Sequence, residues 1–305
     1  MPAEVHPEQV AQGVHRLATG RGITGSNVYF VQSAGSWSLI DAAWPHSGHE
    51  IRAAAERLFG SGTRPASILL THVHPDHSGS ALELARMWEV AVHVHPDEMP
   101  LVGGGYRPEY SNPLDRWLIV PCMRVLPARR VEHAISESGL TGVAQPLDPA
   151  GPVPGLPDWD CIPTPGHTPG HVAFFREADR VLVTGDAVLT VNLNSAWALL
   201  RRKPEVSGPP YISTWSWPAA KASVATLAEL APQVLAPGHG TPMADAATAP
   251  ALRDLAERLK PRAGRREAGR AGEPRRSQGF SRPVDYARRA AGGRSRSPSS
   301  ARRSA

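Results

Sequence analysis

The most constraining feature of the chain is a segment of six residues that holds three histidines and one aspartate. Residues 72–77 read H-V-H-P-D-H and follow the run 67–70, S-I-L-L, which predicts a strand ending here. His72 and His74 project the same way in an extended chain, because side chains two residues apart share a face. The aspartate and the third histidine follow in a turn opened by proline, where the backbone can aim them at a second point. Imidazole and carboxylate suit zinc, manganese or iron, so this segment could supply ligands to two adjacent metals.

Three later segments repeat the same pattern of an apolar strand, a turn of small residues and a side chain able to bind metal. His167 lies in T-P-G-H-T-P-G-H, Asp186 follows V-L-V-T-G, and His239 follows V-L-A-P-G. A further carboxylate, Asp41, directly follows the predicted strand 37–40. Loops at strand ends are where α/β folds place their chemistry, so we expect these side chains to meet.

Taken in order, these segments resemble the five sequence motifs of the metallo-β-lactamase superfamily, with a metal motif set similar to that of glyoxalase II. The match runs from Asp41 through H-x-H-x-D-H to His239 and covers roughly residues 10–260. The resemblance implies an α/β fold of the αββα sandwich type, in which two mixed β-sheets are flanked by helices and metal binds at one sheet edge.

The resemblance further implies a dinuclear site for two zinc ions, with iron or manganese as alternatives. Asp186 would bridge both metals, and Asp41 would accept a hydrogen bond that orients a ligand imidazole. Asp76 would also be catalytic, because it could hold the bridging hydroxide by a hydrogen bond and later move its proton. The first metal would be bound by His72, His74 and His167, and the second by Asp76, His77 and His239.

Other side chains are given supporting roles. We interpret His171 as a structural residue or as a partner of the ligands. Trp44 and His46 follow the strand end at Asp41 and are candidates for the substrate pocket, as is Tyr106.

These features favour a hydrolase that uses a metal-bridging hydroxide to cleave a small ester, thioester or lactone. Asp186 speaks against a true β-lactamase, because the corresponding position there is typically cysteine or serine. Two alternatives stay open. The first is a mononuclear iron enzyme similar to persulfide dioxygenases, and the second is a phosphodiesterase, nuclease or nucleic-acid-associated protein that uses a basic tail.

The charge distribution weakens the nucleic-acid alternative. The chain has a formal net charge of +5, but residues 261–305 hold 13 arginines and three acidic residues, so residues 1–260 carry −5. The tail is poor in apolar residues, which predicts disorder. We therefore expect a folded domain over 1–260 and a disordered tail over 261–305.

The rest of the sequence predicts a cytoplasmic enzyme that acts on a small molecule. The N-terminus lacks the profile of a signal peptide, and we see no apolar run long enough for a membrane helix. Cys122 and Cys161 are expected to be reduced thiols, although a disulfide between them is not excluded. The oligomeric state is left open.

The pattern of apolar residues and turn signals predicts alternating strands and helices, interrupted by residues 96–150. That stretch holds the glycine run 103–105 and two predicted helices, near 112–119 and 129–138, and we interpret it as a helical insertion that shapes the pocket. The other predicted strands are 27–31, 37–40, 67–71, 90–95, 159–162, 171–175, 180–184 and 234–236, and the other predicted helices are 49–59, 78–88, 219–230 and 249–260.

Overall fold

Neighbouring residues of the central strands point into two different hydrophobic cores, and this alternation produces a layered architecture. In β3 (Ser26–Ser33), Val28 and Phe30 enter one core while Tyr29 and Val31 enter the other. Because successive side chains of a strand face opposite sides, a continuous apolar run indicates a strand buried on both faces. The computed structural model describes residues 6–20, 25–104, 107–125, 139–195, 197 and 205–260.

The first sheet has seven strands, which lie in the order in which they occur along the chain. The pairs from β1 to β4 are antiparallel, and those from β4 to β7 are parallel. Besides β3 it contains β1 (Glu8–Ala11), β2 (Val14–Thr19), β4 (Ser36–Ile40), β5 (Ile68–Leu69), β6 (Val92–Val94) and β7 (Ala144–Pro146).

The second sheet has four strands in the order β11, β10, β9, β8. β10 pairs with β11 in parallel and with β9 antiparallel, so this sheet is also mixed. Its strands are β8 (Asp160–Pro163), β9 (Val172–Arg176), β10 (Val181–Gly185) and β11 (Val234–Pro237).

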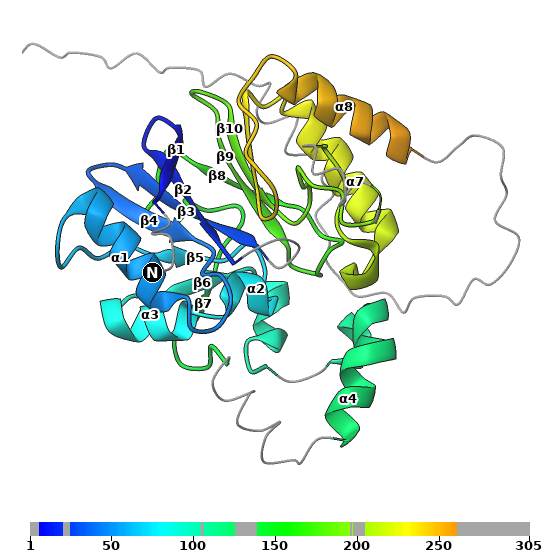
Figure 1. Ribbon diagram of the computed structural model, residues 1–305, viewed down its shortest axis with the longest axis horizontal. Coiled ribbons are helices and arrows are strands. Elements are labelled where there is room, and N and C mark those ends of the chain that lie inside the picture. Colours follow the sequence, from blue (N-terminus) through cyan, green and yellow to red (C-terminus); the bar gives the residue numbers. More distant parts are fainter. Residues whose placement is uncertain are drawn as a thin grey trace, which may run out of the picture. The chain divides into compact units, whose positions relative to one another are not determined.

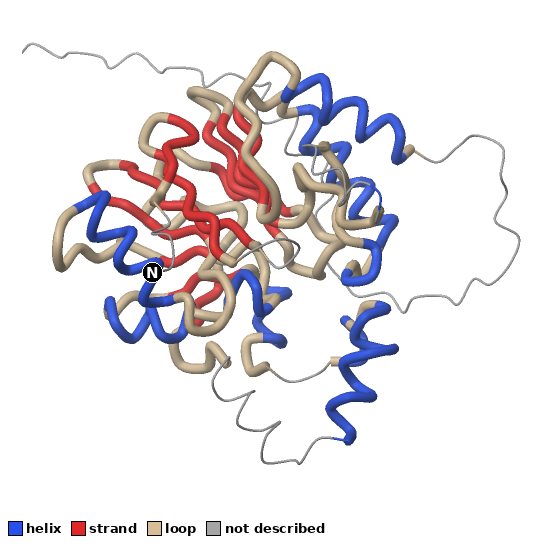
Figure 2. Tube along the Cα trace, in the orientation of Figure 1, coloured by secondary structure: helices blue, strands red, loops and turns tan. Residues whose placement is uncertain are grey.

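Helices cover the outer face of each sheet (Figures 1 and 2). α1 (Gly48–Phe59) and α3 (Ala81–Trp88) pack on the first sheet, where Ile51 and Leu84 join its outer core. α7 (Trp217–Glu229) and α8 (Thr248–Leu259) lie on the opposite side, over the second sheet. The core between the sheets combines residues of both, such as Ile40 with Phe174. The predicted αββα sandwich is confirmed.

The region 96–150 is helical where a helix was predicted near 112–119, but it also contains a strand that was not predicted. Its last part contains β7, which pairs with β6 in parallel, so these residues complete the first sheet. A three-residue strand containing proline is too short to produce a recognisable pattern. The first part contains short helices: η2 (Pro96–Leu101), η3 (Pro108–Tyr110), the π-helix η4 (Asp115–Ile119) and α4 (Val120–Val125).

Several other predictions can be placed on the structure. The helix predicted near 129–138 and the tail 261–305 lie outside the described residues. Cys122 is exposed, Cys161 is buried, and both are free thiols. Across the described part of the chain, every helix is too short or too polar to cross a membrane.

Candidate metal centre

The candidate ligands and their supporting residue Asp41 follow five strands whose carboxyl ends meet at one edge of the sandwich. Asp41 comes directly after β4, His72 after β5, His167 after β8, Asp186 after β10 and His239 after β11. Backbone hydrogen bonds hold these loops together: the amide N–H of residue 172 donates to the carbonyl of 71 at 2.9 Å, and that of 238 donates to 185 at 2.8 Å. The second histidine-rich turn is therefore anchored to the first.

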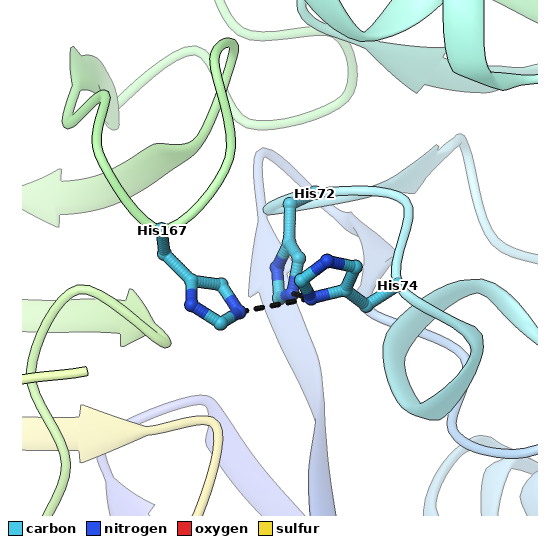
Figure 3. Close-up of side chains that lie close together, drawn as sticks. All are labelled: His72, His74 and His167. Atoms are coloured by element: carbon cyan, nitrogen blue, oxygen red, sulfur yellow. Dashed lines mark hydrogen bonds between the residues drawn. The ribbon is translucent and has the colours of Figure 1, made fainter. Parts of the chain in front are cut away.

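Three histidines bring ring nitrogens to one point (Figure 3). His72 Nε2 lies 3.1 Å from His74 Nδ1, which in turn lies 2.9 Å from His167 Nε2. The first two project from the loop after β5 and the third from the loop after β8, so the group joins the two sheets. We call these residues the first ligand group.

A second ligand group consists of Asp76, His77 and His239. His239 Nε2 lies 3.2 Å from Asp76 Oδ2 and 3.4 Å from His77 Nε2. Asp76 and His77 both lie in α2 (Pro75–Ser78), the short helix that turns them away from His74. The expected re-aiming of Asp76 and His77 is observed.

Asp186 stands between the two groups. Its Oδ2 atom lies 3.4 Å from both His167 Nε2 and His239 Nε2, and its Oδ1 atom lies 3.3 Å from His77 Nε2. The side chain is buried, and Oδ1 accepts no hydrogen bond from any described residue. A buried carboxylate oxygen without a donor is costly, and a cation at this point would remove that cost.

The hydrogen-bond partner of Nδ1 in each ring decides which nitrogen carries the lone pair. His72 Nδ1 lies 3.0 Å from the Thr71 hydroxyl, His77 Nδ1 lies 2.8 Å from Asp41 Oδ2, and His239 Nδ1 lies 2.6 Å from the carbonyl oxygen of residue 25. An imidazole that donates from Nδ1 carries its lone pair at Nε2. In the neutral form of these three rings Nε2 would therefore face the centre with its lone pair, which is the arrangement a metal requires.

Asp41 supports both groups at once, as predicted for its contact with a ligand imidazole. Besides His77, it accepts hydrogen bonds from the Thr71 amide at 2.8 Å and from the Thr71 hydroxyl at 2.9 Å. Thr71 in turn contacts His72, so the carboxylate acts on one ring directly and on another through a hydroxyl. Its backbone has φ of 62°, a left-handed conformation that is uncommon outside glycine and that is enriched at functional sites.

His171 has both ring nitrogens engaged away from the centre. Nδ1 lies 2.7 Å from the Thr164 hydroxyl, and Nε2 accepts the backbone N–H of Asp186 at 3.0 Å. Its lone pair is therefore used to hold the loop of Asp186. This geometry agrees with a supporting role.

Comparison with known proteins identifies the family. A model of the metallo-beta-lactamase superfamily matches residues 21–239. The chain belongs to this superfamily. It is 39% identical over 254 residues to the "probable metallo-hydrolase YflN" of Bacillus subtilis, which covers 82% of this chain and 92% of YflN. It is also 30% identical over 222 residues to the uncharacterized protein YobT of the same organism, covering 70% of this chain and 82% of YobT.

Solved structures of the superfamily share the fold. The metallo-beta-lactamase family protein TTHA1429 from Thermus thermophilus has a TM-score of 0.57 at 24% identity, covering 82% of this chain and 79% of that one. The DIM-1 metallo-beta-lactamase has a TM-score of 0.56 at 17% identity, covering 84% of this chain and 99% of that one. At these identities the likeness concerns the fold alone.

The surroundings of the two ligand groups shift the pKa values of their histidines in opposite directions. Burial and repulsion from neighbouring histidines lower the pKa values of His72 and His167 well below the usual range. Burial also acts to lower the pKa of His239, but attraction to Asp186 and hydrogen bonds to Asp186 and Asp76 raise it to about 10. The carboxylates likewise outweigh burial at His77 and raise its pKa. The second group thus favours positive charge, whether that charge is a proton or a metal ion.

Close backbone approach is required at the centre of the site. A Cβ atom on Gly238 would lie 2.5 Å from Asp186 Oδ1 and 2.6 Å from the His77 ring. Only glycine leaves room for both side chains at this point. The glycine of the P-G-H-G segment is therefore explained by the site itself.

Residues outside the motifs also support the site. Asn27 and Tyr29 donate hydrogen bonds to the carbonyl of Pro237 at 2.9 and 2.7 Å and so fix the turn of His239. Thr214 Oγ1 lies 3.4 Å from His167 Nδ1. Sequence reasoning missed these partners because a single polar residue in an apolar or irregular stretch has no distinctive pattern.

The proposed pocket residues are less closely tied to the centre. Trp44 and His46 lie in the loop between Asp41 and α1, and both side chains are exposed. The Trp44 carbonyl accepts a hydrogen bond from the Ser80 hydroxyl at 2.7 Å. Tyr106 lies outside the described residues. The contribution of all three to a pocket stays a prediction.

Proposed function

We propose that the chain is a metallo-hydrolase that binds two divalent metals, zinc by preference, and cleaves a small ester, thioester or lactone. His72, His74 and His167 would hold one metal, Asp76, His77 and His239 would hold the other, and Asp186 would contact both. Two carboxylates among five imidazoles suit zinc, a borderline cation that accepts nitrogen and oxygen ligands.

The position of Asp186 carries the proposal. Its two oxygens lie within 3.4 Å of ring nitrogens from both ligand groups, so a single carboxylate can serve two metals. Its unsatisfied Oδ1 atom provides a specific reason for a cation on the side of His77.

When bound, two such metals lower the pKa of water to about 7 and polarise a substrate oxygen, which supplies a nucleophile and stabilises developing negative charge. The protein contributes position and proton transfer. Asp76 is the more exposed of the two carboxylates at the centre, with 20% of its side chain accessible against 4% for Asp186. We therefore assign proton transfer to Asp76, which can reach both the site and the solvent.

The thiols of the chain are poor candidates for the nucleophile. Cys161 is buried between the sheets, and burial together with Asp148 and Asp160 raises its pKa to about 12. A thiol is reactive as the thiolate, so this group is almost fully protonated at neutral pH. Cys122 lies in α4, is exposed, and is distant in sequence from the seven candidate ligands.

Elemental analysis of the purified protein is the first test of this proposal. We expect about two zinc ions per chain after reconstitution, and hydrolysis of members of a panel of thioesters, lactones and small esters. Activity should be lost on treatment with a chelator and restored by zinc. One iron per chain, with oxygen consumed on a thiol-derived substrate, would instead establish the persulfide dioxygenase-like alternative.

Phosphodiester and RNA substrates in the same panel test the nucleic-acid alternative. Residues 1–260 carry a formal charge of −5, which disfavours binding to a polyanion outside the tail. A chain ending at Lys260 should hydrolyse its small substrate as fast as the full chain. RNA cleavage that persists after this truncation would contradict the choice of substrate class.

A further inference from the structure

We propose that Glu98 is a positioning residue that ties together the two loops of the first ligand group and so sets the spacing of His72, His74 and His167. The inference rests on the proposed metal centre but concerns a residue outside every motif that defines it. Glu98 lies in η2, directly after β6, and its side chain is buried.

The two carboxylate oxygens of Glu98 accept hydrogen bonds from different loops. Oε2 accepts the backbone N–H of Val73 at 3.0 Å, and Oε1 accepts the backbone N–H of Gly170 at 2.8 Å. Val73 lies between His72 and His74, and Gly170 follows the turn that carries His167. One side chain therefore spans the two segments whose ring nitrogens meet in Figure 3.

A close approach at Gly170 makes this contact specific. A Cβ atom there would lie 2.8 Å from His95 Nδ1, 2.9 Å from Glu98 Cγ and 2.9 Å from the Glu98 backbone nitrogen. A side chain at this position would force the loop of His167 away from η2. His95 in turn accepts the N–H of Asp97 at 3.1 Å, which fixes the start of the helix.

The bonds made by Glu98 are fully shielded from solvent, where a hydrogen bond is electrostatically stronger than in water. Loss of either hydrogen bond would release one of the two loops from Glu98 while the other loop stays bound to it. Because His74 Nδ1 and His167 Nε2 lie only 2.9 Å apart, a small relative shift of the loops changes the ligand geometry. Loss of a comparable partner behind metal ligands typically lowers metal affinity 10- to 100-fold.

The variant Glu98→Gln tests this proposal. Glutamine has nearly the same shape but offers one acceptor oxygen, and its NH₂ group faces an N–H donor, so one of the two loops loses its bond. In the metal-free protein we expect faster amide hydrogen exchange at Val73 or Gly170. In the metal-loaded protein we expect zinc affinity, measured by competition with a chelator, to fall about 10- to 100-fold.

The absorption spectrum of the cobalt(II)-substituted protein provides a readout that a merely structural role would not change. We expect the visible bands of Glu98→Gln to shift in position or intensity relative to the wild type, because the ligands of the first group are displaced. Asp148→Asn is the matched control, since Asp148 also accepts a backbone N–H, that of Ala150 at 3.0 Å, in an exposed turn. This control should retain wild-type affinity and spectrum.

Gly170→Ala perturbs the same contact while leaving the carboxylate in place, and it keeps the proposal testable if Glu98→Gln does not fold. It should lower zinc affinity and alter the cobalt spectrum in the same direction. Unchanged affinity and spectrum in either folded variant would overturn the role of Glu98. Failure of the wild-type protein to bind metal would instead overturn the proposed function, and hydrogen exchange in the metal-free protein would still report on the contact.

Discussion

The two ligand groups lie side by side but are built on different principles. The first consists of imidazoles alone, and burial lowers the pKa values of His72 and His167, so these rings are neutral acceptors. The second includes Asp76, and nearby carboxylates raise the pKa values of His77 and His239. The first group therefore depends on the placement of uncharged rings, whereas the second depends on the balance of charge.

This difference explains which outer residues each group needs. Glu98 and Thr214 contact the loops and rings of the first group through hydrogen bonds that set position. Asp41 places a negative charge against His77 of the second group. Asp186 belongs to both groups, since its oxygens reach ring nitrogens of each.

Asp186→Asn should have the largest effect, because it removes the charge that the two groups share. We expect metal content to fall from about two per chain to one or fewer. Activity should fall by more than about 100-fold, since loss of a ligand should exceed the effect of losing an outer partner. The control is Asp179→Asn, at an ion pair with Arg176 remote from the candidate ligands, which should retain activity. Two metals and full activity in Asp186→Asn would refute the shared role.

Single alanine variants of His167 and His239 separate the two groups. Each removes one imidazole from a different group, so each should lose about one metal and keep the other. His239→Ala should also leave Asp76 without its nearest positive partner. Metal analysis and calorimetric titration with zinc measure this directly. If both variants lost both metals together, the two groups would not be independent sites.

Asp41→Asn should have an intermediate effect. The amide cannot accept from both Thr71 and His77 in the same way as the carboxylate, so the His77 ring loses a charged partner. We expect a 10- to 100-fold decrease in activity and in the metal affinity of the second ligand group. If zinc titration showed an equal loss of metal affinity in both ligand groups, the hydrogen bond from Thr71 to Asp41 would matter as much as the contact of Asp41 with His77.

The smallest effect is expected at the thiols, which belong to neither group. Near pH 8 an alkylating reagent should modify Cys122 quickly and Cys161 very slowly. With a pKa of about 12, only about 1 in 10,000 Cys161 side chains is a thiolate there, and the fraction rises only as pH approaches that value. Mass spectrometry counts the adducts. Activity should change less than about twofold on modification of Cys122, and a larger loss would place a thiol in the site.

Most of the fold could be predicted because its strands are long apolar runs bounded by turns. The runs at β3, β4 and β10 were predicted within a few residues, as were α1, α7 and α8. β1, β2 and β7 could not be identified, since they are short, partly exposed or interrupted by proline and lack a clear period. β1 and β7 are the two edge strands of the first sheet, and β2 lies between β1 and β3, so pairing with neighbouring strands rather than a local pattern defines all three.

The predicted ligands were identified by order and spacing, but their partners were not. The structure brings all seven candidate residues together at one edge, in three overlapping clusters that include both predicted groups and a third made of His72, His77 and Asp186, while their division between two metals and their binding of metal stay predictions. Glu98 and Asn27 could not be identified from the sequence, because each makes contacts to residues distant along the chain. Helix 129–138 and Tyr106 stay outside the described residues.

By itself the sequence determined the types of side chain at the site, the strands that carry them and the membership of a superfamily. Local patterns suffice for this, because hydrophobic periodicity and a turn place each ligand at a strand end. The tertiary structure decided which nitrogen of each ring faces the centre and how the loops are held. Those properties depend on hydrogen bonds between segments such as His74 and His167, 93 residues apart, which come together only when the two sheets pack.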